Sequence, residues 1–315
     1  MVAVLVIPDG AAQPLRPGVP TALAAARTPV LDALAAAGEV ARVAVTPPAV
    51  PPGSEAGVPA LLGHPPQRPL GRGRIDAAGY GVPVPAGMVA WRADVPREDG
   101  VGPARTAAAA LGGAWTHGHR LVVFAPADEV PEGGMGVRMW ADGAALPRVL
   151  DETTVVVAAR GAAAGCARLL GAALLVPPGA TGDVDTDLHA KARAAVDAIA
   201  RGARSVVVHV GAPDEAAHRR DAAAKVAALE AIDAALLAPL RDAVARTGGT
   251  LAVCPDHGTD PFDGVHDADA VPALRWGDGI APIGPQRMTE AASAGAPVCP
   301  PAWPLHGAAL VEAAA

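Results

Sequence analysis

Aromatic residues are scarce in this chain and make up only 3% of its 315 residues. Phe, Tyr and Trp bury the largest area per side chain in most cores, so this core must be built from Ala, Val and Leu. A hydrophobic content of 51% is sufficient for one large domain, or for one domain with an insertion. With 36 Gly and 33 Pro, we expect many tight turns.

The chain also lacks an excess of basic residues. It has 25 Lys and Arg against 32 Asp and Glu, and its net charge is -7. A nucleic-acid partner normally requires a basic face, so the composition argues against one. Lysine is nearly absent: Lys191 and Lys225 are the only two. Both fall in helical patterns, where we expect solvated surface positions.

No cysteine motif and no membrane-spanning run is present. Cys166, Cys254 and Cys299 are odd in number, far apart and without CxxC spacing, which predicts reduced thiols and a cytosolic location. No stretch approaches the roughly 18 apolar residues of a membrane span. Residues 2–7 followed by Asp9 are typical of a first strand and not of a signal peptide. We therefore expect a soluble, cytoplasmic protein without a membrane partner.

Short β-branched runs alternate with Ala-rich amphipathic stretches, a pattern that predicts an α/β sheet covered by helices on both faces. The expected strands are residues 2–7, 39–45, 121–125, 153–159, 172–176, 204–210 and 249–254. The expected helices are residues 29–37, 54–62, 184–201 and 221–246.

The stretch 64–150 differs from the rest, because it is rich in Pro, Gly and Arg and shows weak periodicity. We interpret it as a small inserted cap region. The core is then discontinuous and consists of residues 1–63 and 151–315.

Polar residues follow several of the expected strands. Open α/β sheets bind ligands at the carboxyl ends of their strands, so these side chains should meet at one edge. Asp214 and His218 are four residues apart and would share one face of a helix. Carboxylate and imidazole ligands suit Zn, Mn and related ions, and six of them are enough for two ions. The six residues are Asp9, Asp214, His218, Asp256, His257 and His266.

Each of these residues also has an ordinary interpretation. An Asp after a strand is usually part of a turn or a helix cap, and His266 could be a plain loop histidine. Ser54 begins an apolar run, so it could be a simple N-cap. Taken alone, the residue favours the cap, but it could also be a nucleophile at a helix N-terminus, where the helix dipole and free N–H groups favour an alkoxide and a bound phosphoryl group.

Taken in order, these residues resemble the archaeal-type, cofactor-independent phosphoglycerate mutases of the alkaline phosphatase superfamily. The motifs that carry the resemblance are Asp9-Gly10, Thr28 to Asp32, Pro52 to Glu55, Leu61 to Gly63, Gly71 to Gly73, Val89 to Arg92, Gly179 to Thr186, His209-Val210 with Asp214 and His218, Asp256 to Thr259, and His266 with Val271-Pro272. The resemblance implies an alkaline-phosphatase-like sheet sandwiched by helices, with an inserted cap.

The resemblance also implies roles for the site residues. Ser54 would be phosphorylated during turnover. Asp9, Ser54, Asp256 and His257 would hold one divalent ion. Asp214, His218 and His266 would hold the other, with Mn favoured over Zn or Mg. The substrate would be a small phosphorylated metabolite, held by basic residues that we assign as Arg72, Arg74, Arg92, Arg105 and Arg160.

The sequence departs from the family pattern in more than one respect. Ala164 stands where the family has a lysine that contacts the transferring phosphate, and the insertion is shorter than is usual there. We therefore expect a two-metal phosphoryl-transfer enzyme that works through a phosphoserine, either as a mutase or as a phosphatase. The alternative is a catalytically impaired, metal-dependent protein that binds a phosphorylated ligand.

Overall fold

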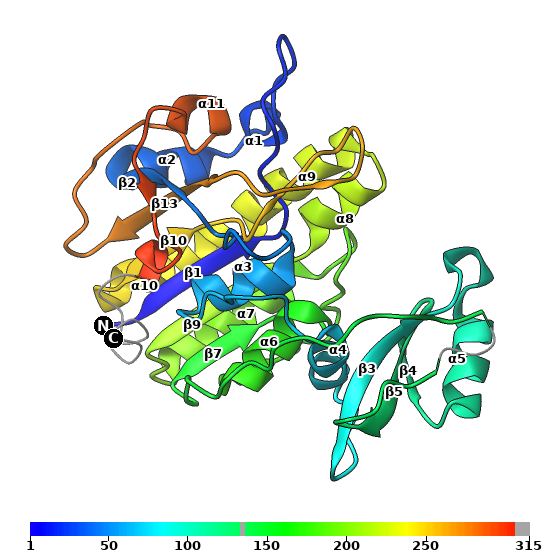
Figure 1. Ribbon diagram of the computed structural model, residues 1–315. Coiled ribbons are helices and arrows are strands. Elements are labelled where there is room, and N and C mark those ends of the chain that lie inside the picture. The colour runs from blue at the N-terminus through cyan, green and yellow to red at the C-terminus, as the bar shows by residue number, and fades with distance from the viewer. Residues whose placement is uncertain (133–135, 306–315) are drawn as a thin grey trace.

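The computed structural model of the protein describes residues 1–132 and 136–305. Figure 1 shows a large lobe and a smaller one, which contains β3, β4, β5 and α5. The large lobe is built on an eight-stranded sheet. In order across this sheet the strands are β14 (Val298–Cys299), β2 (Glu39–Val43), β13 (Val271–Gly277), β10 (Thr250–Val253), β1 (Ala3–Pro8), β9 (Ser205–Val210), β7 (Thr154–Val157) and β8 (Ala173–Leu175).

The strands from β10 to β8 are parallel to one another, whereas β13 runs antiparallel to both β10 and β2. All residues of β1 and β9 are buried, as expected for parallel strands that are covered on both faces. Side chains alternate between the two faces of a strand. Accordingly, Val4 and Val6 face one hydrophobic cluster, and Leu5 and Ile7 face another.

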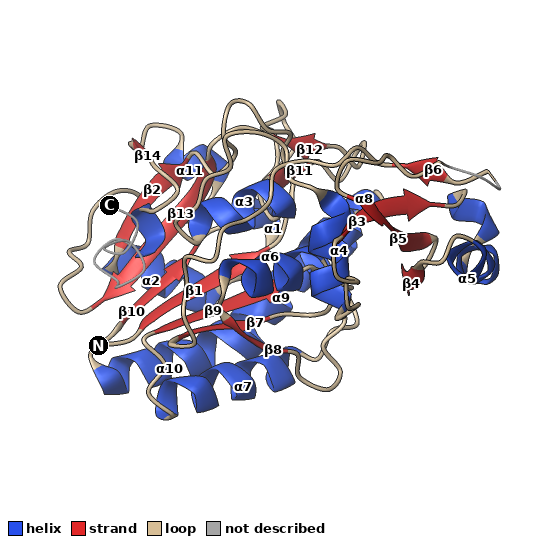
Figure 2. Cartoon of the chain, turned by 60° about the horizontal axis from the view of Figure 1, so that its bottom comes forward, coloured by secondary structure: helices blue, strands red, loops and turns tan. Residues whose placement is uncertain are grey.

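Helices cover both faces of the sheet, which confirms the predicted fold class (Figure 2). The cluster around Val4 and Val6 is completed by α1 (Ala22–Ala25), α2 (Pro29–Ala37), α7 (Leu188–Ala200), α9 (Ala222–Ile232) and α10 (Ala238–Thr247). The opposite cluster is completed by α3 (Ser54–Leu61), α6 (Ala162–Leu170) and a short turn, η3 (Trp303–Leu305). The large lobe also contains α8 (Ala212–His218), α11 (Glu290–Ser293) and a small ribbon of β11 (Gly258–Thr259) and β12 (His266–Asp267).

The small lobe is an antiparallel sheet with the order β4 (Ala114–His117), β5 (Arg120–Pro126), β3 (Met88–Asp94) and β6 (Arg138–Met139). It has its own apolar cluster, in which Ala104 and Ala107 of α5 (Val101–Ala110) pack with Leu121 and Val123. A single helical turn, η1 (Arg97–Asp99), precedes α5. This lobe comes from the stretch that we interpreted as an insertion.

The helix α4 (Arg72–Tyr80) joins the two lobes, because it packs against both α6 and β3. Two glycines make this close approach possible. A Cβ on Gly73 would lie 2.2 Å from the carbonyl oxygen of Ala90, and one on Gly79 would lie 2.1 Å from that of Gly161. Larger residues at either position would push the lobes apart.

Two of the helix predictions were partly wrong. The predicted helix 184–201 begins only at Leu188, because the Asp187 side chain accepts a hydrogen bond from the backbone N–H of Ala190 and caps the helix there. The predicted helix 221–246 is interrupted by a π-helical segment, η2 (Asp233–Leu237). The strand β13 was not predicted, since Pro272 argues against a central strand.

The two lysines also contradict the prediction of solvated positions. Both side chains are fully buried and donate to backbone carbonyls: Lys191 to that of His209, and Lys225 to those of Ala12 and Thr259. No helix within residues 1–132 and 136–305 has the length and apolarity to cross a bilayer.

Candidate metal centre

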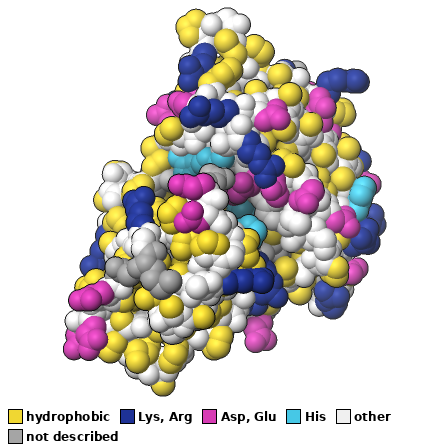
Figure 3. All heavy atoms as spheres, turned by 90° about the vertical axis from the view of Figure 1, so that its right-hand side faces the viewer, with side chains coloured by type: hydrophobic (Ala, Val, Ile, Leu, Met, Phe, Trp, Pro, Cys, Tyr) yellow, Lys and Arg dark blue, Asp and Glu magenta, His cyan; other side chains and the backbone are white. Residues whose placement is uncertain are grey.

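The six candidate ligands meet at the carboxyl edge of the central strands. Asp9 follows β1, Asp256 and His257 follow β10, Asp214 and His218 lie on α8 after β9, and His266 opens β12. Figure 3 shows histidine and acidic side chains gathered near the middle of one face of the molecule. The structure therefore brings these residues together as the sequence pattern predicted.

The first group, which we call site A, consists of Asp9, Asp256 and His257. One ligand atom from each of the three residues lies within 4.8 Å of the others. The Nε2 atom of His257 is 3.0 Å from Oδ1 of Asp9 and 3.9 Å from Oδ1 of Asp256. All three residues are buried.

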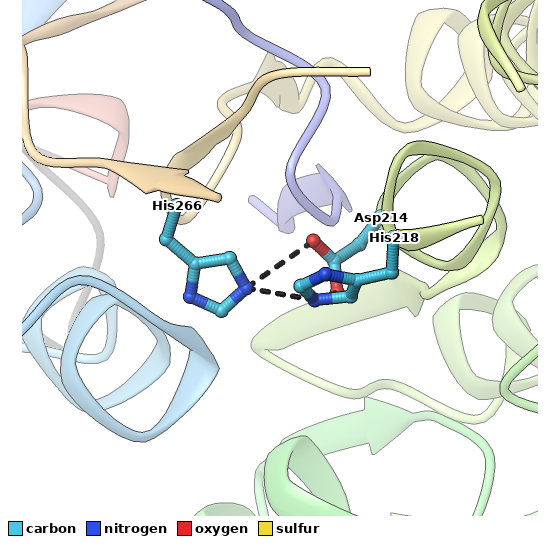
Figure 4. Close-up of side chains that lie close together, drawn as sticks. All are labelled: Asp214, His218 and His266. Carbon is cyan, nitrogen blue, oxygen red and sulfur yellow. Dashed lines mark hydrogen bonds and ion pairs between the residues drawn. The ribbon is translucent and has the colours of Figure 1, made fainter. Parts of the chain in front are cut away.

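The second group, site B, consists of Asp214, His218 and His266. One ligand atom from each of these residues again lies within 4.8 Å of the others. His218 Nε2 is 3.2 Å from Asp214 Oδ2, and His266 Nε2 is 3.5 Å from Asp214 Oδ1. Figure 4 shows both rings turned toward the carboxylate, with one dashed line between the histidines. The two Nε2 atoms are only 2.9 Å apart.

Sites A and B are in contact with each other. The ring of His257 in site A packs against that of His266 in site B, with a centroid separation of 4.2 Å and an angle of 37° between the ring planes. Thr259 joins the sites as well, because its hydroxyl lies 2.5 Å from Asp214 Oδ1 and 3.2 Å from His257 Nδ1. Two ions bound here would be neighbours.

The backbone determines which nitrogen of each histidine faces inward. The Nδ1 atom of His218 is 2.8 Å from the Gly264 carbonyl, and that of His266 is 3.0 Å from the Pro52 carbonyl. A carbonyl only accepts hydrogen bonds, so each Nδ1 carries a proton. Each Nε2 is then free to present a lone pair to the centre of site B, the arrangement found in metal-ligating histidines.

Two further observations, one in each site, fit a pair of cations. In site B, two Nε2 lone pairs face each other at 2.9 Å, which is unfavourable unless a positive charge lies between them. In site A, the buried atoms Asp256 Oδ2 and His257 Nε2 have no hydrogen-bond partner. A buried polar atom without a partner is costly, and a cation would satisfy both.

The electrostatics of the protein alone also favour positive charge here. Burial disfavours the charged form of His257, but Asp256 and Asp9 outweigh it and hold the pKa of His257 well above its usual value. Burial likewise opposes ionisation of Asp214, yet its close contacts with His218 and His266 hold its pKa well below the ordinary range. The carboxylate of Asp214 is therefore ionised and attracts either protons or metal ions.

Ser54 lies beside site A. Its Oγ is 3.2 and 3.3 Å from the two carboxylate oxygens of Asp9, to which it donates. The N-cap of α3 is Gly53, so Ser54 is the first helical residue and not the cap. The helix approaches site A closely, because a Cβ on Gly57 would lie 1.9 Å from the Asp256 carbonyl oxygen.

Of the five arginines that we assigned to the substrate, Arg72 contacts the residue next to this serine in the chain. It forms an ion pair with Glu55, the residue that follows Ser54. The other four make contacts within the protein. Arg74 pairs with Asp142, Arg92 is buried against Asp94, Arg105 lies over the Trp115 ring, and Arg160 donates to the Tyr80 carbonyl.

Sequence reasoning missed two charged residues close to these groups. His209 is buried, and its Nε2 is 3.3 Å from Asp9 Oδ2 and 3.7 Å from Asp256 Oδ2. Burial works against its charge, but the two aspartates raise the pKa of His209 to about 9. The second is Arg120, whose charge interacts with Asp76 and Tyr80 at the junction of the lobes, although burial lowers its pKa. The His209-Val210 motif in the sequence was the signal that could have identified this histidine as a site residue.

The position that lacks the expected lysine is closed to solvent. Ala164 is completely buried on α6. The helix α6 packs against α3, whose first residue is Ser54. Neither lysine of the chain occupies this place, because Lys191 and Lys225 bind backbone carbonyls elsewhere.

Comparison with known proteins agrees with this geometry. A family model described as the Metalloenzyme superfamily matches residues 1–296. The chain belongs to this superfamily. It is 28% identical to the 2,3-bisphosphoglycerate-independent phosphoglycerate mutase of Methanoculleus marisnigri, over 82% of this chain and 84% of that protein.

Other relatives match over shorter stretches. Phosphoglycerate mutase 2 of Methanothermobacter thermautotrophicus is 45% identical over 103 residues, which are 33% of this chain and 25% of that relative. Among solved structures, the PH0037 protein from Pyrococcus horikoshii is 23% identical, with a TM-score of 0.76 over 94% of this chain and 91% of that one. The cofactor-independent phosphoglycerate mutase from Thermoplasma acidophilum is 18% identical, with a TM-score of 0.63 over 95% and 96% of the two chains. These structures share the fold.

Proposed function

We propose that the protein is a metal-dependent phosphoryl-transfer enzyme of the phosphoglycerate mutase type, which acts on a small phosphorylated metabolite through a phosphoserine at Ser54. The observation that carries this proposal is the position of the Ser54 hydroxyl, 3.2 Å from Asp9 at the edge of two adjoining ligand sets. The names of the archaeal relatives support the mutase type of reaction.

Sites A and B would hold two divalent ions, for which we favour Mn over Zn or Mg. Such a pair supplies Lewis acidity that lowers the pKa of a hydroxyl and neutralises charge on a phosphoryl group. The protein's own residues do the rest. Asp9 orients the serine oxygen, and the first-turn N–H groups of α3 would donate to a phosphoryl group bound at Ser54.

We assign Arg72 to the substrate because its charge lies next to Glu55 and hence close to Ser54. Positioning of this kind accounts for most of the catalysis in phosphoryl transfer, since little covalent chemistry is asked of the protein itself. Arg74, Arg92, Arg105 and Arg160 contact residues that do not adjoin Ser54 in the chain, so we rank them below Arg72.

The substitution Ser54→Ala tests the proposal. We expect it to abolish turnover while both ions still bind, because the carboxylates and imidazoles of sites A and B remain. In the wild type, tandem mass spectrometry after brief incubation with substrate should find a phosphoryl group on Ser54. The matched control is Ser293→Ala, since that serine is buried in α11 and donates to the Thr289 carbonyl. Undiminished turnover in Ser54→Ala would rule out the phosphoserine route.

The outcome of the reaction can be read from one incubation. With 3-phosphoglycerate and Mn²⁺, a mutase forms 2-phosphoglycerate without free phosphate, whereas a phosphatase releases phosphate. Ala164 favours measurable release, because the lysine that would hold the transferring group is absent.

A further inference from the structure

The chain uses lysine and arginine very unequally. Of its 25 basic residues, Lys191 and Lys225 are the two lysines, which leaves 23 arginines. Both lysine side chains are fully buried. Burying an ammonium group is expensive, and a guanidinium cannot replace it easily, because it is planar and larger. The chain therefore has lysine only where a compact donor sits inside the protein.

Lys225 lies on α9 and reaches two loops that carry candidate ligands. Its ammonium donates to the Ala12 carbonyl at 3.1 Å and to the Thr259 carbonyl at 2.6 Å. Ala12 is three residues after Asp9, and Thr259 is two residues after His257. One side chain thus ties the loop after β1 to the loop after β10.

Further hydrogen bonds connect Thr259 to residues of both sites. The backbone N–H of Thr259 donates to the same Ala12 carbonyl at 2.8 Å. The hydroxyl of Thr259 then contacts Asp214 of site B and His257 of site A. The backbone of Gly10 packs tightly against these side chains, because a Cβ on Gly10 would lie 2.5 Å from Thr259 Oγ1 and 2.6 Å from Asp214 Oδ1.

We propose that Lys225 is a positioning residue for the paired-cation centre, and that it presets sites A and B by fixing the distance between the loops that hold Asp9 and Asp256–His257. This inference rests on the proposed function only in assuming that cations bind there. An apolar side chain at position 225 would leave the Thr259 carbonyl without its donor, so that the Asp256–Thr259 loop could shift relative to Asp9. Outer partners of this kind typically influence metal affinity by 10- to 100-fold.

The first test compares Mn²⁺ binding by wild type and Lys225→Met in isothermal titration calorimetry. We expect the variant to bind Mn²⁺ at least about 10-fold more weakly. The control is Leu229→Met on the same helix, a buried, nearly volume-neutral change one turn away at an apolar side chain that donates no hydrogen bond to either loop. Affinity of Lys225→Met within about twofold of the control would overturn the inference. Wild type that binds no Mn²⁺ would instead refute the cation centre itself.

A second measurement does not depend on the variant folding. With lysine labelled by ¹⁵N at Nζ, the wild type gives two side-chain signals, which Lys191→Met assigns. If Lys225 orders the loops for cation binding, then cation binding must in turn order the loops around Lys225. We therefore expect diamagnetic Zn²⁺ to slow the exchange of the Lys225 ammonium protons with water at least about 10-fold. Exchange that is unchanged by saturating Zn²⁺ would show that Lys225 is a structural residue uncoupled from the centre.

Discussion

At the scale of single residues, backbone carbonyls decide the chemistry of the centre. The carbonyls of Gly264 and Pro52 fix the protons on Nδ1 of His218 and His266, so that both Nε2 atoms face Asp214. That these side chains lie close together could be predicted from sequence, because polar residues after parallel strands share one edge. The carbonyl partners could not, since they come from loops whose course no periodicity describes.

Burial of the lysines was equally hidden from the sequence. A helical pattern shows which face of a helix is apolar, but not how deeply a long side chain reaches. Lys191 lies on α7 and donates to the His209 carbonyl at 2.7 Å. Burial lowers its pKa to about 8, against the partly compensating charge of Asp9.

This shift predicts a pH-dependent stability. In the folded protein Lys191 loses its proton near pH 8, whereas in the unfolded chain it holds it to about 10.5. The unfolded state binds more protons between these values, so the lysine's contribution to the free energy of unfolding rises with pH there, by about 3 kcal/mol at most. The difference between wild type and Lys191→Met, measured by urea unfolding in EDTA, should grow from pH 8 to 10. A constant difference would contradict the shifted pKa.

At the scale of elements, the strands were predicted better than the helix ends. Runs such as residues 204–210 are buried on both faces, and no competing periodicity obscures them. The π-helical η2 had no such signal, because residues 221–246 have apolar side chains at helical spacing throughout. Its first residue makes a tertiary contact that the periodicity does not show. Asp233, the first residue of η2, turns toward α2 and accepts from the N–H groups of Val30 and Leu31 at 3.1 and 2.7 Å.

Asp233 therefore acts as a cap supplied from outside the helix, since Thr28, the N-cap residue of α2, makes no side-chain cap bond. We expect Asp233→Ala to lower the free energy of unfolding by about 1–3 kcal/mol, because it leaves two N–H donors without their acceptor. Chemical denaturation followed by circular dichroism would measure this. Asp242→Ala on the exposed side of α10 is the control, and equal stability of the two variants would disprove the capping role.

At the scale of the whole molecule, the sheet and the metal-site edge followed from the sequence, whereas the lobe junction did not. Arg92, for example, matched a motif but is buried against Asp94, with Trp140 also bound to that carboxylate. These contacts depend on how the strands of the small lobe pack against α4, and all of these elements lie within residues 64–150. The weak periodicity of that stretch gave no basis for predicting them.

Cation binding should stabilise the whole fold. Sites A and B draw ligands from loops after β1, β9 and β10, so bound ions would hold the centre of the sheet together. At a Mn²⁺ concentration 100 times the dissociation constant, linkage gives about 2.7 kcal/mol per site. We expect a clear rise in melting temperature from EDTA to excess Mn²⁺, measured by calorimetry. Removal of the site B carboxylate in Asp214→Asn should reduce that rise, and an undiminished rise would place the stabilising ion elsewhere.

The enclosure of both lysines has a practical consequence. In the folded protein neither lysine ammonium group reaches solvent, since both side chains are fully buried. An amine-selective reagent applied to the native protein should therefore leave Lys191 and Lys225 unmodified, whereas unfolding exposes both side chains to it. Modification of these two lysines, followed by mass spectrometry, would thus report unfolding of the large lobe.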